Sequence, residues 1–179
     1  MNIDYADMFR TLHPDFFASE AIRSLPREYV FEEQVLDLHR FSVGQLEISC
    51  PEHIVFGLYA GDIDALREAV RQVDADWPQY FHEGDRIYCA FEDDQVVSFC
   101  LLDDLGQYGG LRVGGPGCVG TLPEYRKQGI GLRLVQNATA ILKADGFDLS
   151  YIHYTHVGHW YARLGYQTVV RWNARGIVE

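Results

Sequence analysis

Residues 123–131 combine a proline, two basic side chains and two glycines in a pattern suited to binding a phosphate. An apolar stretch ends at Pro123, Arg126 and Lys127 follow, and Gly129 opens a run with helical periodicity. A strand, turn and helix in this order expose backbone N–H groups at the positive end of a helix dipole, where anions bind. Glycines let a ligand approach the backbone closely. The segment therefore predicts a phosphate or pyrophosphate site, and a turn whose glycines serve only close packing is the alternative.

Two better-known phosphate motifs do not account for the glycines. Residues 115–120 match the spacing G-x-G-x-x-G, but that fingerprint needs a strand before it and a helix opening within it. Here an apolar strand and then Pro123 follow, so we interpret the match as accidental and the glycines as marks of a bulged strand. A G-x-x-x-x-G-K-[ST] run is absent from the sequence.

Two segments in the expected order resemble the signatures of a known family. The spacing Pro123-x-x-Arg126-x-x-Gly129-x-Gly131, after a Val-rich strand, resembles the acetyl-CoA-binding motif of the GNAT superfamily of N-acetyltransferases. Residues 161–166, Tyr-Ala-Arg-Leu-Gly-Tyr, resemble its second signature, a Tyr on a short helix followed by Gly and an aromatic residue. The resemblance extends from roughly residue 53 to the C-terminus.

This resemblance implies both a fold and an activity. The fold is α/β, a mixed α+β sheet of the GNAT-like acyl-CoA N-acyltransferase type, splayed between the strands ending near Thr121 and beginning near Asp148. The activity is transfer of an acetyl group from acetyl-CoA to a primary amine of a small cationic molecule, directly within a ternary complex. Three alternatives stay open: a protein or peptide N-acetyltransferase, a non-catalytic acyl-CoA sensor with the same fold, and a nucleotide-binding protein.

The resemblance also implies which residues hold acetyl-CoA, the cosubstrate. The strand before the turn would pair its backbone with the pantetheine arm through Val119, Gly120 and Thr121. The pyrophosphate would lie on the turn amides of Arg126, Lys127, Gln128, Gly129, Ile130, Gly131 and Leu132. This sequence departs from the family in one respect, because residues 154–160 lack the Asn that many members carry before the signature Tyr.

Tyr161 is the expected catalytic residue, because the resemblance places it near the thioester sulfur. Acyl transfer from a thioester needs a proton for the departing thiolate, and a phenol with a pKa of about 10 can supply one to a thiol with a pKa of about 8.5. A backbone N–H near Cys118 or Val119 could stabilise the oxyanion of the tetrahedral intermediate. The alternative for Tyr161 is a core aromatic residue in a chain rich in such residues.

Histidines and acids further supply candidate ligands and bases. His153, His156 and His159 are three residues apart, but an expected strand and Gly158 interrupt a common helix face, so we predict no metal. His156 or His159 is expected to line the acceptor pocket and to accept a proton, since imidazole titrates near neutrality. The other base candidates lie near strand ends, with a solvated turn as the alternative for each: Glu92, Asp103 and Asp104. Aromatic residues expected to line the pocket are Trp77, Tyr80 and Phe81.

The elements that must position these residues follow from periodicity and from turn residues. A continuous apolar run predicts a strand covered on both faces at Ile54–Tyr59, and Asp62 is placed to cap a helix. Asp93 and Asp94 indicate a hairpin turn. The remaining predicted elements are strands at Arg86–Glu92, Gln95–Leu102, Cys118–Leu122, Phe147–Thr155 and Gly165–Trp172, and helices at Gly129–Ala144 and His159–Leu164.

The sequence pattern of the first 51 residues differs from that of the rest, which predicts two regions. Residues 1–51 are expected to form an N-terminal appendage of short helices, with a hairpin as a further possibility. Residues 52–179 are expected to form the GNAT-like N-acetyltransferase domain. Asp4 and Asp15 can cap helices that end before Pro14 and Pro26. Residues 29–41 are ambiguous between helix and strand, and residues 46–49 suggest a short strand.

Composition excludes several classes of protein. The 179 residues carry a net charge of −11, with 26 acidic against 15 basic residues, so neither nucleic acid nor a membrane is an expected partner. The four cysteines form no C-x-x-C pair and are expected to be buried thiols in a reducing compartment. Acids in residues 1–10 and the lack of a long apolar run predict a cytoplasmic protein. The sequence is also compatible with a homodimer.

Overall fold

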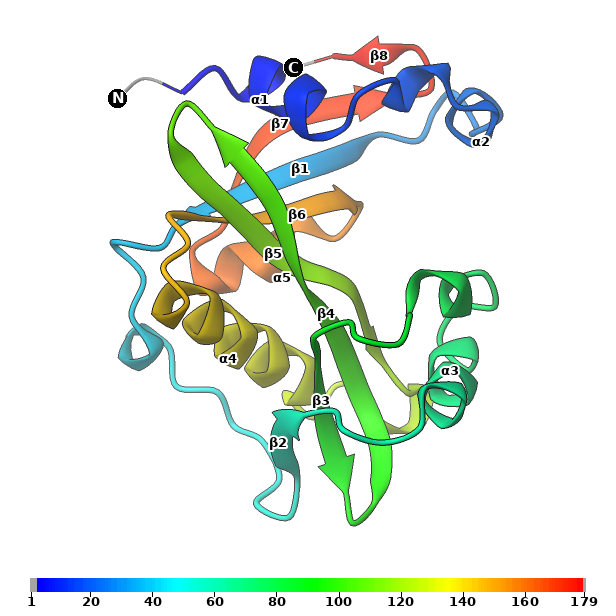
Figure 1. Cartoon of the computed structure of the whole chain (residues 1–179), viewed down its shortest axis with the longest axis vertical. Coiled ribbons are helices and arrows are strands. Elements are labelled where there is room, and N and C mark those ends of the chain that lie inside the picture. The colour runs from blue at the N-terminus through cyan, green and yellow to red at the C-terminus, as the bar shows by residue number, and fades with distance from the viewer. Residues whose placement is uncertain (1–2, 179) are drawn as a thin grey trace.

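Eight strands form one mixed sheet in the computed structural model, which describes residues 3–178 (Figure 1). The strand order is β2-β3-β4-β5-β6-β1-β7-β8, and all neighbours are antiparallel except β5 and β6. The strands are β1 Phe31–Asp37, β2 Val55–Leu58, β3 Ile87–Glu92, β4 Gln95–Tyr108, β5 Leu111–Thr121, β6 Leu149–Thr155, β7 Gln167–Asn173 and β8 Gly176–Ile177. The helices are α1 Tyr5–Leu12, α2 Glu20–Arg23, α3 Ile63–Arg71, α4 Ile130–Ala144 and α5 Gly158–Tyr161.

The two parallel strands in the middle of the sheet pair over a very short distance. β5 and β6 are in register only at Val113 with Leu149 and at Gly114 with Ser150. Just beyond, Gly115 lies so close to β6 that a Cβ there would stand 1.9 Å from the carbonyl oxygen of Tyr151. β5 then continues to Thr121 paired only with β4. This confirms the mixed α/β sheet and its expected splay.

Helices cover the sheet on both faces. Alternate residues of β4 point in opposite directions, so Cys100 and Leu102 pack with α4 while Phe99 and Leu101 pack with α3. In Figure 1 the two helices accordingly lie on opposite sides of β3 and β4. Among residues 3–178 no helix is long and apolar enough to cross a bilayer.

Of the three helix starts predicted at aspartate residues, two are confirmed and one is wrong. The Asp4 carboxylate accepts a hydrogen bond from the N–H of Asp7 at the start of α1, and Asp62 accepts two at the start of α3. Asp15 instead has a left-handed backbone (φ 59°) and makes no cap. Because the chain turns there, the expected helix is replaced by a 3-10 turn at Phe16–Ala18 and the short α2.

The strand predicted to be covered on both faces lies at the edge of the sheet. β2 pairs only with β3, and the side chains of Val55 and Leu58 are 62% and 54% exposed. A continuous apolar run indicates a strand but not its position in a sheet, so this part of the prediction was wrong. Residues 46–49 form no strand either, and a 3-10 turn at Val43–Gln45 precedes them.

Part of the N-terminal segment is built into the sheet. β1 lies between β6 and β7 and is antiparallel to both. It makes no hairpin with residues 38–51, which contain no strand. Residues 3–51 therefore share the sheet of the rest of the chain, and the division of the chain into two domains after residue 51 stays a prediction.

The four cysteines are free thiols, as expected for a chain without a disulfide framework. Cys89 and Cys100 are buried, and Cys50 and Cys118 are half-buried. Burial raises the pKa of the Cys89 thiol to about 12, so this cysteine is protonated at neutral pH.

The close approach of β5 and β6 predicts that Gly115 tolerates no side chain. Gly115→Ala should lower the free energy of unfolding by roughly 1–3 kcal/mol, because its methyl group would overlap the Tyr151 carbonyl. Gly57→Ala in β2 is the matched control, since nothing lies within 4 Å of the added atom. Thermal unfolding of both variants tests this, and an unchanged melting temperature for Gly115→Ala would contradict it.

Candidate functional site

A β-bulge interrupts β5 in the part of the strand that β6 leaves uncovered. Leu101 of β4 is opposite Gly117 and Phe99 is opposite Gly120, so two residues of β5 face Cys100 alone. The first of the two, Cys118, has a left-handed backbone (φ 45°). A bulge leaves its extra residue outside the hydrogen-bond ladder and redirects the strand. The expectation of an irregular strand at residues 115–120 is therefore confirmed.

The turn after β5 presents a row of free backbone donors. The N–H groups of residues 127–132 make no hydrogen bond within the part of the chain that the structure describes. Lys127 and Gly129 have left-handed backbones, with φ of 62° and 81°. No side chain caps α4 and no acid lies in its first turn, so the positive end of the helix dipole is uncompensated. These N–H groups can bind an anion.

Neighbouring contacts hold this turn in place. The Arg126 guanidinium donates from Nε to the carbonyl oxygen of Thr121, and Ser98 donates to the carbonyl oxygen of Gly120. At the helix start, a Cβ on Gly129 would stand 2.0 Å from the carbonyl oxygen of Ser49. A Cβ on Gly131 would stand 2.7 Å from the hydroxyl oxygen of Thr121. Both glycines are therefore needed for close packing as well as for a free backbone.

Tyr161 lies beside the bulged strand although more than forty residues separate them along the chain. It belongs to a buried cluster with Leu132 of α4 and Ile152 of β6, against which Val119 packs. Its hydroxyl makes no hydrogen bond with any described residue, whereas the hydroxyl of Tyr166 bonds both Thr139 and Ser150. Burial raises the pKa of Tyr161 well above its usual value, so the hydroxyl is protonated and can act as a donor.

The carboxyl group of Asp103 lies beside the bulge. Its Oδ2 is 2.1 Å from where a Cβ of Gly117 would stand, and the carboxylate has no hydrogen-bond partner among the described residues. Burial, with a smaller effect of the Asp85 charge, raises the pKa of Asp103 to about 6. The Asp103 and Asp74 charges add to burial in raising the pKa of Cys118 to about 12. An unpaired acid titrating near neutrality is suited to proton transfer.

The other two acids have structural partners. Glu92 bonds the Tyr125 hydroxyl and forms an ion pair with His53. Asp104 forms an ion pair with Arg112, whose hydrogen bond lowers the pKa of this carboxyl. The carboxylate oxygens of Glu92 and Asp104 are engaged in these contacts. Of the three acids, only Asp103 therefore has an unpaired carboxylate that could act as a base.

The histidines and aromatic residues expected at the pocket do not gather in one place. His156 and His159 are exposed, while His153 bonds Glu33. Tyr80 is 52% exposed, whereas Phe81 is fully buried and its ring packs against that of Phe99.

The structure also brings together residues that sequence reasoning missed. His13 and Glu33 meet His153 from segments far apart in the chain. No local spacing signals such a group, because its members share neither a helix face nor a strand.

Comparison with known proteins identifies the central part of the chain. Residues 83–168 match the family model of the acetyltransferase (GNAT) domain. No curated protein matches the chain. A GCN5-related glucosamine N-acetyltransferase region of a fungal multi-domain GH3 beta-N-acetylglucosaminidase matches with a TM-score of 0.65 and 20% identity, covering 81% of this chain and 20% of that one.

Two further solved structures share the fold. A GCN5-related N-acetyltransferase from Sphaerobacter thermophilus has a TM-score of 0.60 at 18% identity, with 80% of this chain and 50% of that one covered. A tandem GNAT protein from the clavulanic acid biosynthesis pathway has a TM-score of 0.56 at 15% identity, with 80% and 51% covered. The chain thus spans at most about half the length of these three proteins.

The buried Asp103 carboxyl predicts a pH-dependent loss of stability. The folded state holds its proton up to about pH 6, above the pKa of 3.8 for a free carboxyl, so stability falls as pH rises through this interval. Asp103→Asn removes that loss. Above pH 6 its free energy of unfolding should exceed that of the wild type by on the order of 1–3 kcal/mol, and its melting temperature should be higher. At pH 4 the two proteins should be equally stable. Asp104→Asn, the exposed neighbour, should show no such gain. Equal stability of wild type and Asp103→Asn at pH 8 would contradict this.

Proposed function

We propose that this chain, whose residues 83–168 form an acetyltransferase (GNAT) domain, moves an acetyl group from acetyl-CoA to a primary amine of a small cationic molecule. The transfer is direct, within a ternary complex of enzyme, acetyl-CoA and amine. The single observation that carries the proposal is the row of unpaired N–H groups at residues 127–132, next to the uncovered edge of β5.

Coenzyme A fits the sequence of donors along β5 and the turn. Its diphosphate would lie on the amides of residues 127–132, where the dipole of α4 and the exposed Lys127 favour negative charge. The N–H of Arg126 already bonds the carbonyl oxygen of Pro123 and is not one of these donors. The pantetheine arm carries amides and is extended, so it would pair with the backbone of Val119, Gly120 and Thr121 as a strand does. This places the thioester beside the bulge, where a backbone N–H of Cys118 or Val119 would stabilise the oxyanion.

Tyr161 would act on the leaving group. As the amine nitrogen bonds the thioester carbonyl carbon and the C–S bond breaks, negative charge develops on sulfur. The unpartnered hydroxyl of Tyr161 would donate a hydrogen bond to that sulfur and pass its proton as the thiolate leaves. Because burial raises the pKa of Tyr161, the proton moves only when the C–S bond is largely broken and the charge on sulfur is largest, and the tyrosinate then regains a proton from water.

Asp103 would accept the proton that the amine loses. It is the unpaired carboxylate beside Gly117, on the face of the sheet that carries α3. Above pH 6 it is ionised and can take a proton, directly or through a water. The charge of Asp85 acts on Asp103, and that of Asp74 acts on Cys118 beside it, so the site favours an ammonium-bearing acceptor.

Release of coenzyme A tests the function and the role of Tyr161 together. The wild type should release free thiol from acetyl-CoA with at least one member of a panel of polyamines, amino sugars, amino acids and peptides. Tyr161→Phe should lose kcat by about tenfold or more while its affinity for coenzyme A stays unchanged. Tyr166→Phe is the matched control: its hydroxyl bonds Thr139 and Ser150, so it should lose stability but retain kcat.

The outcomes of this assay separate the proposed function from its rivals. Thiol release with peptides alone would favour a protein acetyltransferase. Tight binding of coenzyme A without turnover of any amine would favour a sensor. Retention on immobilised ATP or NAD but not on coenzyme A would show that the turn binds another phosphate.

The pH dependence of the rate tests Asp103. With Asp103 as base, kcat of the wild type should rise with pH through an apparent pKa near 6, because only the ionised carboxylate accepts a proton. Asp103→Asn should lower kcat by about 100-fold and abolish this limb of the profile. Asp104→Asn should retain both the rate and the limb. An unchanged profile in Asp103→Asn would assign the base to another group.

A further inference from the structure

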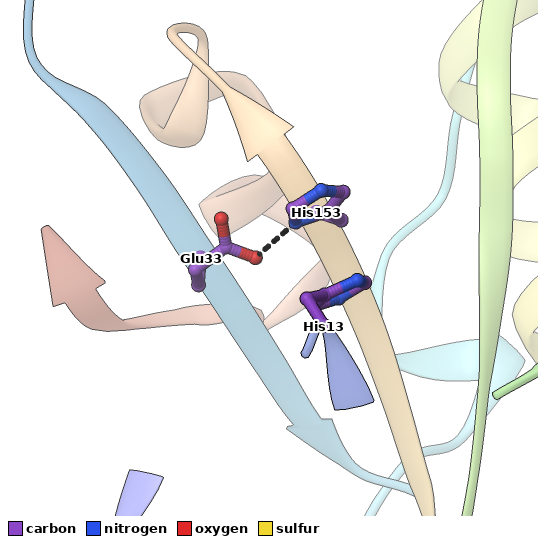
Figure 2. Close-up of side chains that lie close together, drawn as sticks. All are labelled: His13, Glu33 and His153. Atoms are coloured by element: carbon purple, nitrogen blue, oxygen red, sulfur yellow. Dashed lines mark hydrogen bonds and ion pairs between the residues drawn. The ribbon is translucent and has the colours of Figure 1, made fainter. Parts of the chain in front are cut away.

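Three side chains from distant segments converge where α1 meets the sheet. His13 follows the end of α1, Glu33 lies on β1 and His153 on β6 (Figure 2). One potential ligand atom from each lies within 4.8 Å of the others. Figure 2 shows the two imidazole rings side by side, with the carboxylate of Glu33 directed toward His153. None of the three takes part in the proposed acetyl transfer.

Glu33 is a fully buried carboxylate held in a fixed orientation. It has no exposed surface. Its Oε1 accepts hydrogen bonds from the Trp172 indole Nε1 at 2.6 Å and from the backbone N–H of Tyr154 at 3.1 Å. Its Oε2 lies 2.9 Å from Nδ1 of His153, its only ion-pair partner among the described residues. Buried carboxylates are stable when they are paired with a cation or coordinate a metal.

One polar atom beside this carboxylate has no partner. Nε2 of His13 is buried and makes no hydrogen bond with a described residue. Buried polar atoms without partners in a native protein indicate an ordered water or an ion.

We propose that His13, Glu33 and His153 form a binding site for a divalent first-row transition-metal ion of the Zn²⁺ type. The ligands are Nε2 of His13, Nδ1 of His153 and Oε2 of Glu33. Two imidazoles and one carboxylate are a donor set that Zn²⁺ adopts, with a further position left for water. The bonds from Trp172 and Tyr154 to the other carboxylate oxygen would orient this ligand from outside the site.

Binding requires two local changes, and neither breaks a hydrogen bond of His13. The rings of His13 and His153 stack at 3.8 Å with an interplanar angle of 13°, so their in-plane lone pairs run nearly parallel. The His13 ring must therefore turn about its side-chain bonds to direct Nε2 at the ion. At His153 the ion replaces the proton between Nδ1 and Glu33. That proton moves to Nε2 or to water, and the ring binds the ion as the neutral Nε2–H tautomer. The side chain of His153 is 29% exposed, which gives the ion access.

A bound ion would connect three parts of the fold. It would join the end of α1 to β1 and β6, where the His13 ring already packs against Tyr151 and His153 of β6. The ion thus stabilises the attachment of the N-terminal helix to the sheet.

Titration of Zn²⁺ into the metal-stripped full chain, without an affinity tag, tests the proposal. Calorimetry should show one site per chain. His13→Gln and His153→Gln should each weaken binding by about tenfold or more, because each removes one ligand. His156→Gln is the matched control, since this exposed histidine is near in sequence and outside the cluster. It should bind as the wild type does.

A second readout separates ligation from misfolding. Zn²⁺ should raise the melting temperature of the wild type and of His156→Gln, and leave that of folded His13→Gln unchanged. Co²⁺ in its place should give the intense visible absorption of a tetrahedral site. The absence of a stoichiometric site in the wild type, or equal affinity in His13→Gln and the wild type, would overturn the proposal.

Discussion

The divergence of β5 from β6 is the constraint on which the rest of the structure depends. The two strands approach so closely at Gly115 and Tyr151 that no side chain fits, and they separate directly afterwards. A strand that loses a neighbour leaves one row of backbone groups unpaired, which normally invites aggregation. Here the unpaired row does not lie at an outer edge of the sheet, because β5 stands between β4 and the diverging β6 in the strand order.

The same divergence determines where charge and donors can act. β5 leads into the turn and α4, while β6 leads into α5, so the free amides of the turn and Tyr161 are placed on opposite arms of the opening. The bulge at Cys118 and the carboxylate of Asp103 lie nearer the closed end. The divergence thus leaves the turn amides, the bulge and Tyr161 around one uncovered stretch of β5.

Structural features that depend on neighbouring residues in the sequence were predicted well. Helix caps at Asp4 and Asp62, the turn at Asp93 and Asp94, and the start of α4 depend on neighbouring residues only, and the structure has them. The edge position of β2 and the partners of β1 depend on contacts across the sheet, which periodicity does not report. The burial of Asp103, and the meeting of His13 with Glu33, are likewise products of tertiary packing. Candidate acids could be named from the sequence, but their environments could not.

The place of β1 has a consequence for how the chain reaches its final structure. This strand is synthesised early, yet both of its neighbours, β6 and β7, come from the last thirty or so residues of the described chain. Until β6 and β7 have been synthesised, β1 has no strand to pair with. Glu33, which is buried in the folded protein, is then exposed to solvent. One half of the sheet can assemble as it emerges, whereas the other must wait for the end of translation. Such long-range closure slows folding and leaves an unpaired strand exposed to chaperones in the interval.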